Sequence, residues 1–183
     1  MADPYLRRLL EYNAWANLRL LDFLATLPDS VLDATAAGVY GTVRETLEHM
    51  LSSELIYERY LERLPRDGVE RPEHPDLATL RAIAAQSEVN AARIVGAVPP
   101  PTEVMHLRDG LRSAGTIFVQ LVSHSAEHRT HVCTILGALG YELPELDSWA
   151  HGILVNGDAW PEDWGAEPGD RRAWYAQRWG RVS

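Results

Sequence analysis

The chain has 183 residues, 46% of them hydrophobic, and a formal net charge of −9. This length suits one domain with a proper core, and the negative charge, with basic residues scattered along the chain, argues against a nucleic-acid-binding surface. The single cysteine, Cys133, excludes an intramolecular disulfide and is interpreted as a small packing residue. The sequence shows neither a signal-peptide pattern nor a stretch of transmembrane length, so we expect a cytoplasmic protein that binds neither nucleic acid nor membrane.

Two long helices are predicted in the first third of the chain. Apolar residues recur at helical spacing over 4–27, up to a proline that ends the pattern. A capping box completed by Glu45 predicts a second helix over 42–64. Asn13 and Asn17 lie one turn apart on the first helix, and we interpret them as hydrogen-bonding groups between packed helices, with contact to a site as the alternative.

Two further helices are predicted in the middle of the chain. The third spans about 76–97, because Asp76 can cap its start and three consecutive prolines follow its end. The segment 103–112 alternates too briefly to indicate more than a hairpin or a loop. The fourth helix spans about 114–139 and ends at Gly140, a normal C-terminal signal.

The last part of the chain has a different composition. Glycine and proline interrupt it, and five of the six tryptophans lie beyond residue 148. We expect an irregular but ordered extension over 141–183, with a short helix at about 170–179, whose tryptophans cover the bundle or a partner. These aromatic residues and the apolar helix faces favour a homodimer.

Together the elements predict one all-α domain over 1–183. Its main part, about 4–140, is expected to be a four-helix bundle, and the irregular tryptophan-rich extension follows it. Long segments separate the first helix from the second and the third from the fourth. Such a bundle therefore needs at least one crossover connection.

Histidines on two of these helices mark the candidate site. His124 and His128 share the apolar face of the fourth helix, one turn apart, and His131 lies on the same face, so we expect all three to be buried. A buried imidazole needs a hydrogen-bond partner or a metal. His49 lies on the flank of the second helix, where it suits the edge of a cavity or a partly exposed surface. The pattern indicates a three-histidine metal site, with hydrogen-bonded core histidines as the alternative.

The chain resembles the DinB/YfiT-like family of metalloenzymes, whose members are four-helix bundles with a three-histidine site. The resemblance covers about residues 5–140 and rests on three segments: Tyr12–Asn17, Thr42–His49 and His124–Arg129. It implies that a divalent metal ion, zinc or nickel, is bound by three ligands: His49, His124 and His128. His131 replaces a glutamine that is common in the family, and we interpret it as a group that orients a ligand.

The resemblance also implies a function, because relatives are associated with metal-dependent transfer of low-molecular-weight thiols. We therefore expect an S-transferase that joins such a thiol, as cosubstrate, to a small electrophile. One alternative is a hydrolase that uses a metal-bound water, with Glu127 as a candidate base or simply a surface residue. Another is a stress-related protein that binds metal without turnover. We assign no catalytic residue from the sequence.

Overall fold

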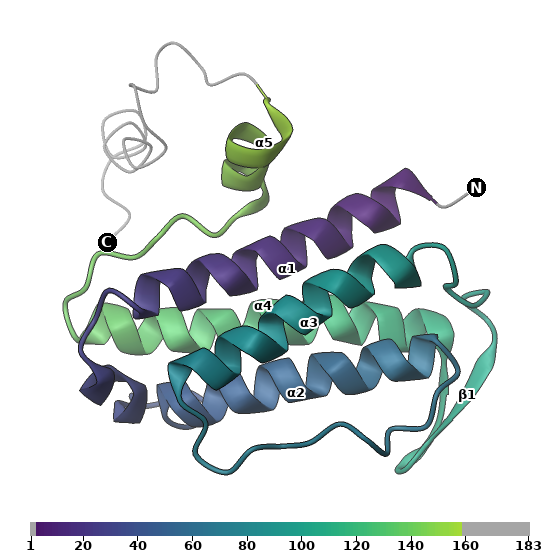
Figure 1. Ribbon diagram of the computed structural model, residues 1–183, viewed down its shortest axis with the longest axis horizontal. Coiled ribbons are helices and arrows are strands. Elements are labelled where there is room, and N and C mark those ends of the chain that lie inside the picture. The colour runs from purple at the N-terminus through teal and green to yellow at the C-terminus, as the bar shows by residue number, and fades with distance from the viewer. Residues whose placement is uncertain (1–2, 159–183) are drawn as a thin grey trace. The chain divides into compact units, whose positions relative to one another are not determined.

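The computed structural model describes residues 3–158, which form helices and one two-stranded hairpin (Figure 1). In chain order the elements are α1 (Pro4–Leu24), the 3-10 helix η1 (Asp29–Asp33), α2 (Val43–Leu61), α3 (Leu77–Ile94), β1 (Val104–Leu107), β2 (Gly110–Ser113), α4 (Ala114–Ala138) and α5 (Ser148–Asn156). The described residues fall into two units, 3–142 and 143–158. The predicted all-α class is confirmed, and the segment left open between hairpin and loop is an antiparallel hairpin.

The four long helices begin at capping side chains. Thr42 accepts a hydrogen bond from the backbone N–H of Glu45, whose carboxylate accepts one from the N–H of Thr42 in return. The side chains of Asp3, Asp76 and Ser113 accept hydrogen bonds from the first turns of α1, α3 and α4. Each cap contributes about 1 kcal/mol. The predicted capping box and the Asp76 cap are therefore confirmed.

The predicted ends of the first three helices are slightly wrong. α1, α2 and α3 end at Leu24, Leu61 and Ile94, each three residues before the predicted boundary. In each case the next residues form tighter turns, in which an N–H bonds to the carbonyl three residues before it. A proline lies shortly beyond each turn, and a proline disfavours helical geometry in the residue that precedes it.

Contacts at the helix ends show that α2 and α3 run in the same direction. Arg44, near the start of α2, donates a hydrogen bond of 2.6 Å to the carbonyl of Pro75, just before α3. Arg93, near the end of α3, pairs with Glu62, just after α2. The link 62–76 must therefore return along the length of both helices, as Figure 1 shows.

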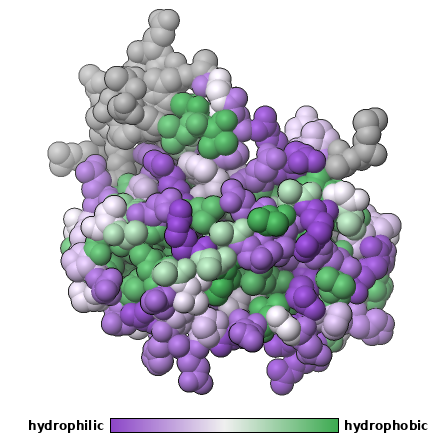
Figure 2. Space-filling view, viewed as in Figure 1, coloured by the Kyte–Doolittle hydropathy of each residue, from purple (hydrophilic) through white to green (hydrophobic). Residues whose placement is uncertain are grey.

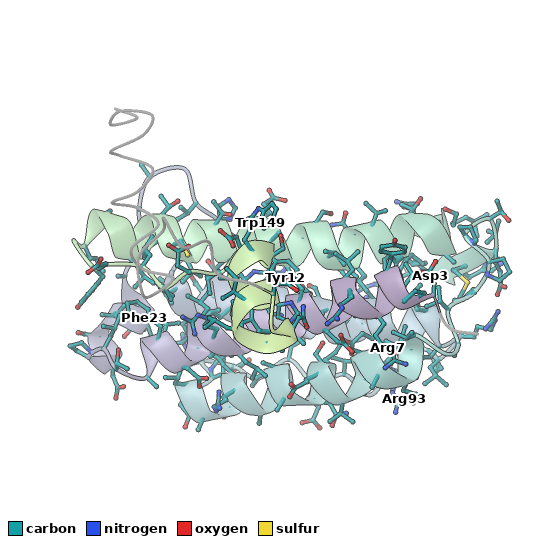
Figure 3. The ribbon with its side chains drawn as sticks, turned by 90° about the horizontal axis from the view of Figure 1, so that it is seen from above. Asp3, Arg7, Tyr12, Phe23, Arg93 and Trp149 are labelled. Carbon is teal, nitrogen blue, oxygen red and sulfur yellow. The ribbon has the colours of Figure 1, made fainter. Side chains whose placement is uncertain are left out.

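The sequence suggests a crossover between the first and second helices or between the third and fourth. The structure has it instead between α2 and α3. Residues 25–42 contain η1, and residues 95–113 contain the hairpin, so both segments are folded up at the ends of the helices. α1 and α3 run in opposite directions: Arg81 near the start of α3 pairs with Asp22 near the end of α1. Figure 3 likewise places Asp3 and Arg93 near the same end of these helices, away from Phe23.

Apolar side chains from α1, α2, α3 and α4 form the core of the first unit. The most extensive contacts join α2 to α4 and α1 to α3. The largest fully buried apolar side chains are Leu20, Leu21, Leu47, Met50, Leu51, Leu61, Leu80, Ile94, Leu121, Ile135 and Leu136. Full burial of one such side chain contributes about 1.5–3 kcal/mol. The surface in Figure 2 mixes hydrophilic residues with scattered apolar ones, and no described helix is long and apolar enough to cross a bilayer.

The second unit contains a helix that the sequence does not predict. α5 is capped by Asp147, whose side chain accepts a hydrogen bond from the N–H of Ala150, and it is followed by Gly157 with a φ of 72°. Both signals are local and could have been found. The helix expected at 170–179 lies outside the described residues.

Two carboxyl groups of α2 lie in the interior. Glu54 and Glu58 are each only 2% exposed, and the Ser87 hydroxyl of α3 contacts an oxygen of both. A hydroxyl has one proton to donate. The two contacts therefore require one carboxyl to carry a proton and donate it to Ser87. Burial, with the neighbouring Glu54 carboxylate, raises the pKa of Glu58 to about 8, which identifies Glu58 as the protonated group.

Replacement of Glu58 by glutamine tests this assignment. In the unmodified protein the Glu58 contribution to the free energy of unfolding falls as the pH rises from about 4.5, where the unfolded carboxyl ionises, to about 8, where the folded one does. The amide of Glu58→Gln stays neutral. Urea denaturation should therefore show that the variant gains stability relative to the parent, by roughly 2–5 kcal/mol between pH 5 and pH 8. A difference that stays constant with pH would contradict a protonated Glu58.

Candidate metal centre

Three histidines from two helices meet in the first unit. His124 and His128 project from successive turns of α4, and His49 faces them from α2, the helix that packs most extensively on α4. The Nε2 atom of His124 lies 3.1 Å from the Nε2 of His49 and 3.1 Å from the Nε2 of His128. The candidate ligand atoms all lie within 4.8 Å of one another. The side chains that the sequence selected are therefore brought together.

Burial keeps these imidazoles neutral. His124 and His128 are 8% and 5% exposed, which confirms their predicted burial, while His49 is half-buried at the edge of the cluster. Burial, and then the neighbouring histidines, lower the pKa of both His124 and His128 to about 4. Burial, and then the charge of Arg71, lower the pKa of His49. At neutral pH the cluster therefore has the uncharged form that binds metals.

The donor set fits a divalent transition metal. Ligand nitrogens at 2.0–2.1 Å from one ion lie about 2.9–3.4 Å apart for angles between octahedral and tetrahedral, and the two 3.1 Å separations fall in that range. The buried Nδ1 atoms of His124 and His128 have no hydrogen-bond partner. Unpaired Nδ1 atoms can carry the imidazole proton, which leaves each Nε2 lone pair directed into the cluster. Three nitrogen ligands leave at least one coordination position open.

Two tyrosine rings line the cluster. Tyr40, from the loop before α2, stacks on His49 with ring centroids 4.4 Å apart and meets His128 edge-on at 5.0 Å. Tyr57 of α2 meets His124 edge-on at 5.7 Å. Tyr40 is itself 52% exposed. The cluster is therefore partly shielded from water, with Tyr40 at its outer side.

An arginine from the crossover link reaches the same cluster. Arg71 donates hydrogen bonds to both carboxylate oxygens of Glu48, at 3.0 and 3.2 Å. Its guanidinium also lies 3.3 Å from the Nδ1 of His49. The link thus places a cation and a carboxylate beside the half-buried ligand. Neither Arg71 nor Tyr40 could be found from the sequence, because each lies in a loop without periodicity.

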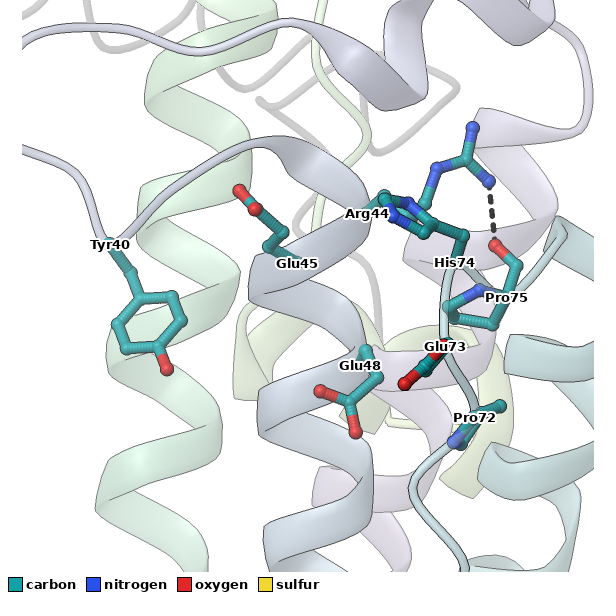
Figure 4. A pocket seen from close by; sticks show the side chains of 8 residues that line it. All are labelled: Tyr40, Arg44, Glu45, Glu48, Pro72, Glu73, His74 and Pro75. Atoms are coloured by element: carbon teal, nitrogen blue, oxygen red, sulfur yellow. Dashed lines mark hydrogen bonds between the residues drawn. The ribbon is translucent and has the colours of Figure 1, made fainter.

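A pocket of about 690 Å³ opens between the start of α2 and the crossover link (Figure 4). Tyr40, which stacks on His49, and Glu48, which binds Arg71, line it, whereas no histidine of the cluster does. Glu45 and Glu48 project from successive turns of α2, and Arg44 closes one side through its bond to Pro75. The pocket thus reaches the residues that surround His49 without exposing a histidine of the cluster.

The remaining candidates lie outside the cluster. His131 is only half-buried, so its predicted full burial is wrong. It meets His128 edge-on with ring centroids 5.3 Å apart, but its Nδ1 has no hydrogen-bond partner, so it does not orient a ligand through that atom. Glu127 is exposed and Cys133 is half-buried. Asn13 and Asn17 are buried and both accept hydrogen bonds from Arg129, at 2.8 and 2.6 Å, as expected of groups between packed helices.

Comparison with known proteins places the chain in a family. No curated protein matches the sequence at a significant level. A family model described as the DinB family matches residues 1–153, which include the four long helices and all three histidines of the cluster. Because this match covers most of the chain, the protein belongs to the DinB family.

Proposed function

We propose that the chain is a four-helix-bundle protein that holds a divalent metal ion on His49, His124 and His128 and transfers a low-molecular-weight thiol to a small electrophile. The observation that carries this proposal is the convergence of three neutral imidazoles, with Nε2 contacts of 3.1 Å, in a partly shielded site. A bound divalent ion would supply Lewis acidity, which lowers the pKa of a thiol. Zinc and nickel both suit this donor set.

The surroundings of the cluster support thiol transfer better than hydrolysis. Hydrolysis needs a general base within reach of a water molecule. Glu127 is exposed, and Glu48 is engaged by Arg71 and by the Ser52 hydroxyl, which donates to it at 2.9 Å. A thiol instead needs an open ligand position and limited access of water. The three-nitrogen set and the tyrosine rings suit both requirements.

Metal content tests the first half of the proposal. The purified chain, without a tag, should bind about one equivalent of zinc or nickel, as measured by mass spectrometry of the metal. His49→Ala, His124→Ala and His128→Ala should each lose most of it while keeping the helical circular dichroism signal. His106→Ala, on the exposed part of the hairpin, is the matched control and should keep the full equivalent. A parent that stays metal-free after reconstitution would identify the cluster as hydrogen-bonded core histidines.

The low pKa values predict unusual resistance of metal binding to acid. Three histidines with an ordinary pKa of about 6.5 would lose about fiftyfold in affinity between pH 7.5 and pH 6, because protons compete for each nitrogen. His124 and His128, with pKa values of about 4, stay deprotonated over this range. Competition with a chelating dye should therefore show a loss of less than about fourfold, half-buried His49 contributing most of it. A fiftyfold loss would contradict these pKa shifts.

Activity assays test the second half. The metal-loaded chain should consume a halogenated nitroarene only when a low-molecular-weight thiol is added, and His49→Ala should lower the rate at least about a hundredfold. His106→Ala should leave the rate unchanged. Hydrolysis of ester or amide substrates without added thiol would favour the hydrolase instead. Retention of metal with neither activity would indicate a binding protein.

A further inference from the structure

A single buried carboxylate connects the two helices of the cluster to the rest of the core. Glu54 lies on α2, five residues after His49, and accepts hydrogen bonds from each of the other long helices. Asn17 of α1 donates to it at 2.8 Å, Ser87 of α3 at 2.5 Å and Ser125 of α4 at 2.7 Å. Its position is thus determined from three directions.

The donors from α4 are placed in a regular way. Each of the two cluster histidines of α4 is followed directly by a residue of this polar network: Ser125 follows His124, and Arg129 follows His128. The Ser125 hydroxyl lies closer to Glu54 than to the carbonyl of Leu121, which is 3.0 Å away. The two turns of α4 that carry His124 and His128 are therefore also held by polar contacts.

The second contact closes a ring of hydrogen bonds. Arg129 donates to the Asn17 side-chain oxygen at 2.6 Å, and the Asn17 amide donates to Glu54. The ring thus runs from Glu54 through Ser125, along one turn of α4 to Arg129, and back through Asn17. Arg129 is 4% exposed and Ser125 is fully buried, so water does not compete for these bonds.

This ring of hydrogen bonds limits the rotation of α4 about its own axis. An imidazole nitrogen about 6–7 Å from the helix axis moves about 2 Å when the helix turns by about 20°. Metal sites tolerate errors of only about 0.2 Å in ligand distances. Apolar packing of α2 on α4 allows helix rotations that move a ligand atom by more than this tolerance. The hydrogen bonds to Glu54, by contrast, are lost after a small rotation.

We propose that Glu54 is a positioning residue for the metal centre: through Ser125 and Arg129 it fixes the rotation of α4 at which His124 and His128 face His49. This inference rests on the proposed metal binding. Ser87 makes a comparable bond to the same carboxylate from α3, which carries no histidine of the cluster. Removing the Ser87 hydroxyl should therefore affect stability alone, whereas removing the Ser125 hydroxyl should also affect the positions of the ligands.

The test compares Ser125→Ala with Ser87→Ala. Each variant removes one hydroxyl that donates to Glu54, so both should lose stability in urea denaturation. Cobalt(II) is the probe, because its visible absorption reports both affinity and ligand geometry. Ser125→Ala should weaken cobalt binding at least about tenfold and alter the absorption spectrum, whereas Ser87→Ala should stay within about twofold of the parent.

Two variants of Glu54 itself complete the test. Glu54→Gln keeps an oxygen for Asn17 and Ser125 and can donate to Ser87, so it should bind cobalt within about threefold of the parent. Glu54→Leu should lose at least about tenfold. Equal affinities in the two serine variants, whether weakened or not, would overturn the positioning role while leaving metal binding intact. A parent that binds no cobalt would overturn the proposed function and this inference with it.

Discussion

The burial of the Glu54 carboxylate is the constraint on which the arrangement of the helices depends. A buried carboxyl group without hydrogen-bond partners would cost free energy, and this one is accommodated because donors from the three other long helices converge on it. Each donor can reach Glu54 only when its own helix has one particular rotation about its axis and one particular position along it. Apolar side chains tolerate alternative packings of similar volume. The polar contacts therefore select one arrangement among those that the apolar core would accept.

Burial in the same core explains why the histidines are neutral. Burial that penalises charge favours imidazole over imidazolium at His124 and His128, while the Glu54 side chain accepts hydrogen bonds from three helices. Burial, and then the neighbouring Glu54 carboxylate, raise the pKa of Glu58 to about 8, so this carboxyl keeps its proton at neutral pH. The same burial thus favours the uncharged form of the two histidines and of Glu58.

Local signals made most of the fold predictable from the sequence. Caps and apolar spacing located α1 to α4 within a few residues, and a separation of four placed His124 and His128 on one face. The buried polar network was missed although a signal existed. Glu54 and Glu58 continue the apolar stripe that contains Leu47 and Leu51, but glutamate at such positions is usually solvated. Tyr40 and Arg71 could not be predicted, because the path of a loop depends on tertiary contacts.

The crossover link contains far more chain than its topology requires. Its 15 residues, 62–76, could span about 50 Å, whereas the 19 residues of α2 extend about 28 Å. Two arginines fix the path of these extra residues. Arg59 donates hydrogen bonds to the carbonyls of Pro65 and Asp67, and Arg71 donates to Glu48. Changes in the length of this segment need not disturb the helices. Relatives could therefore diverge here in the molecules they accept and keep the same histidine cluster.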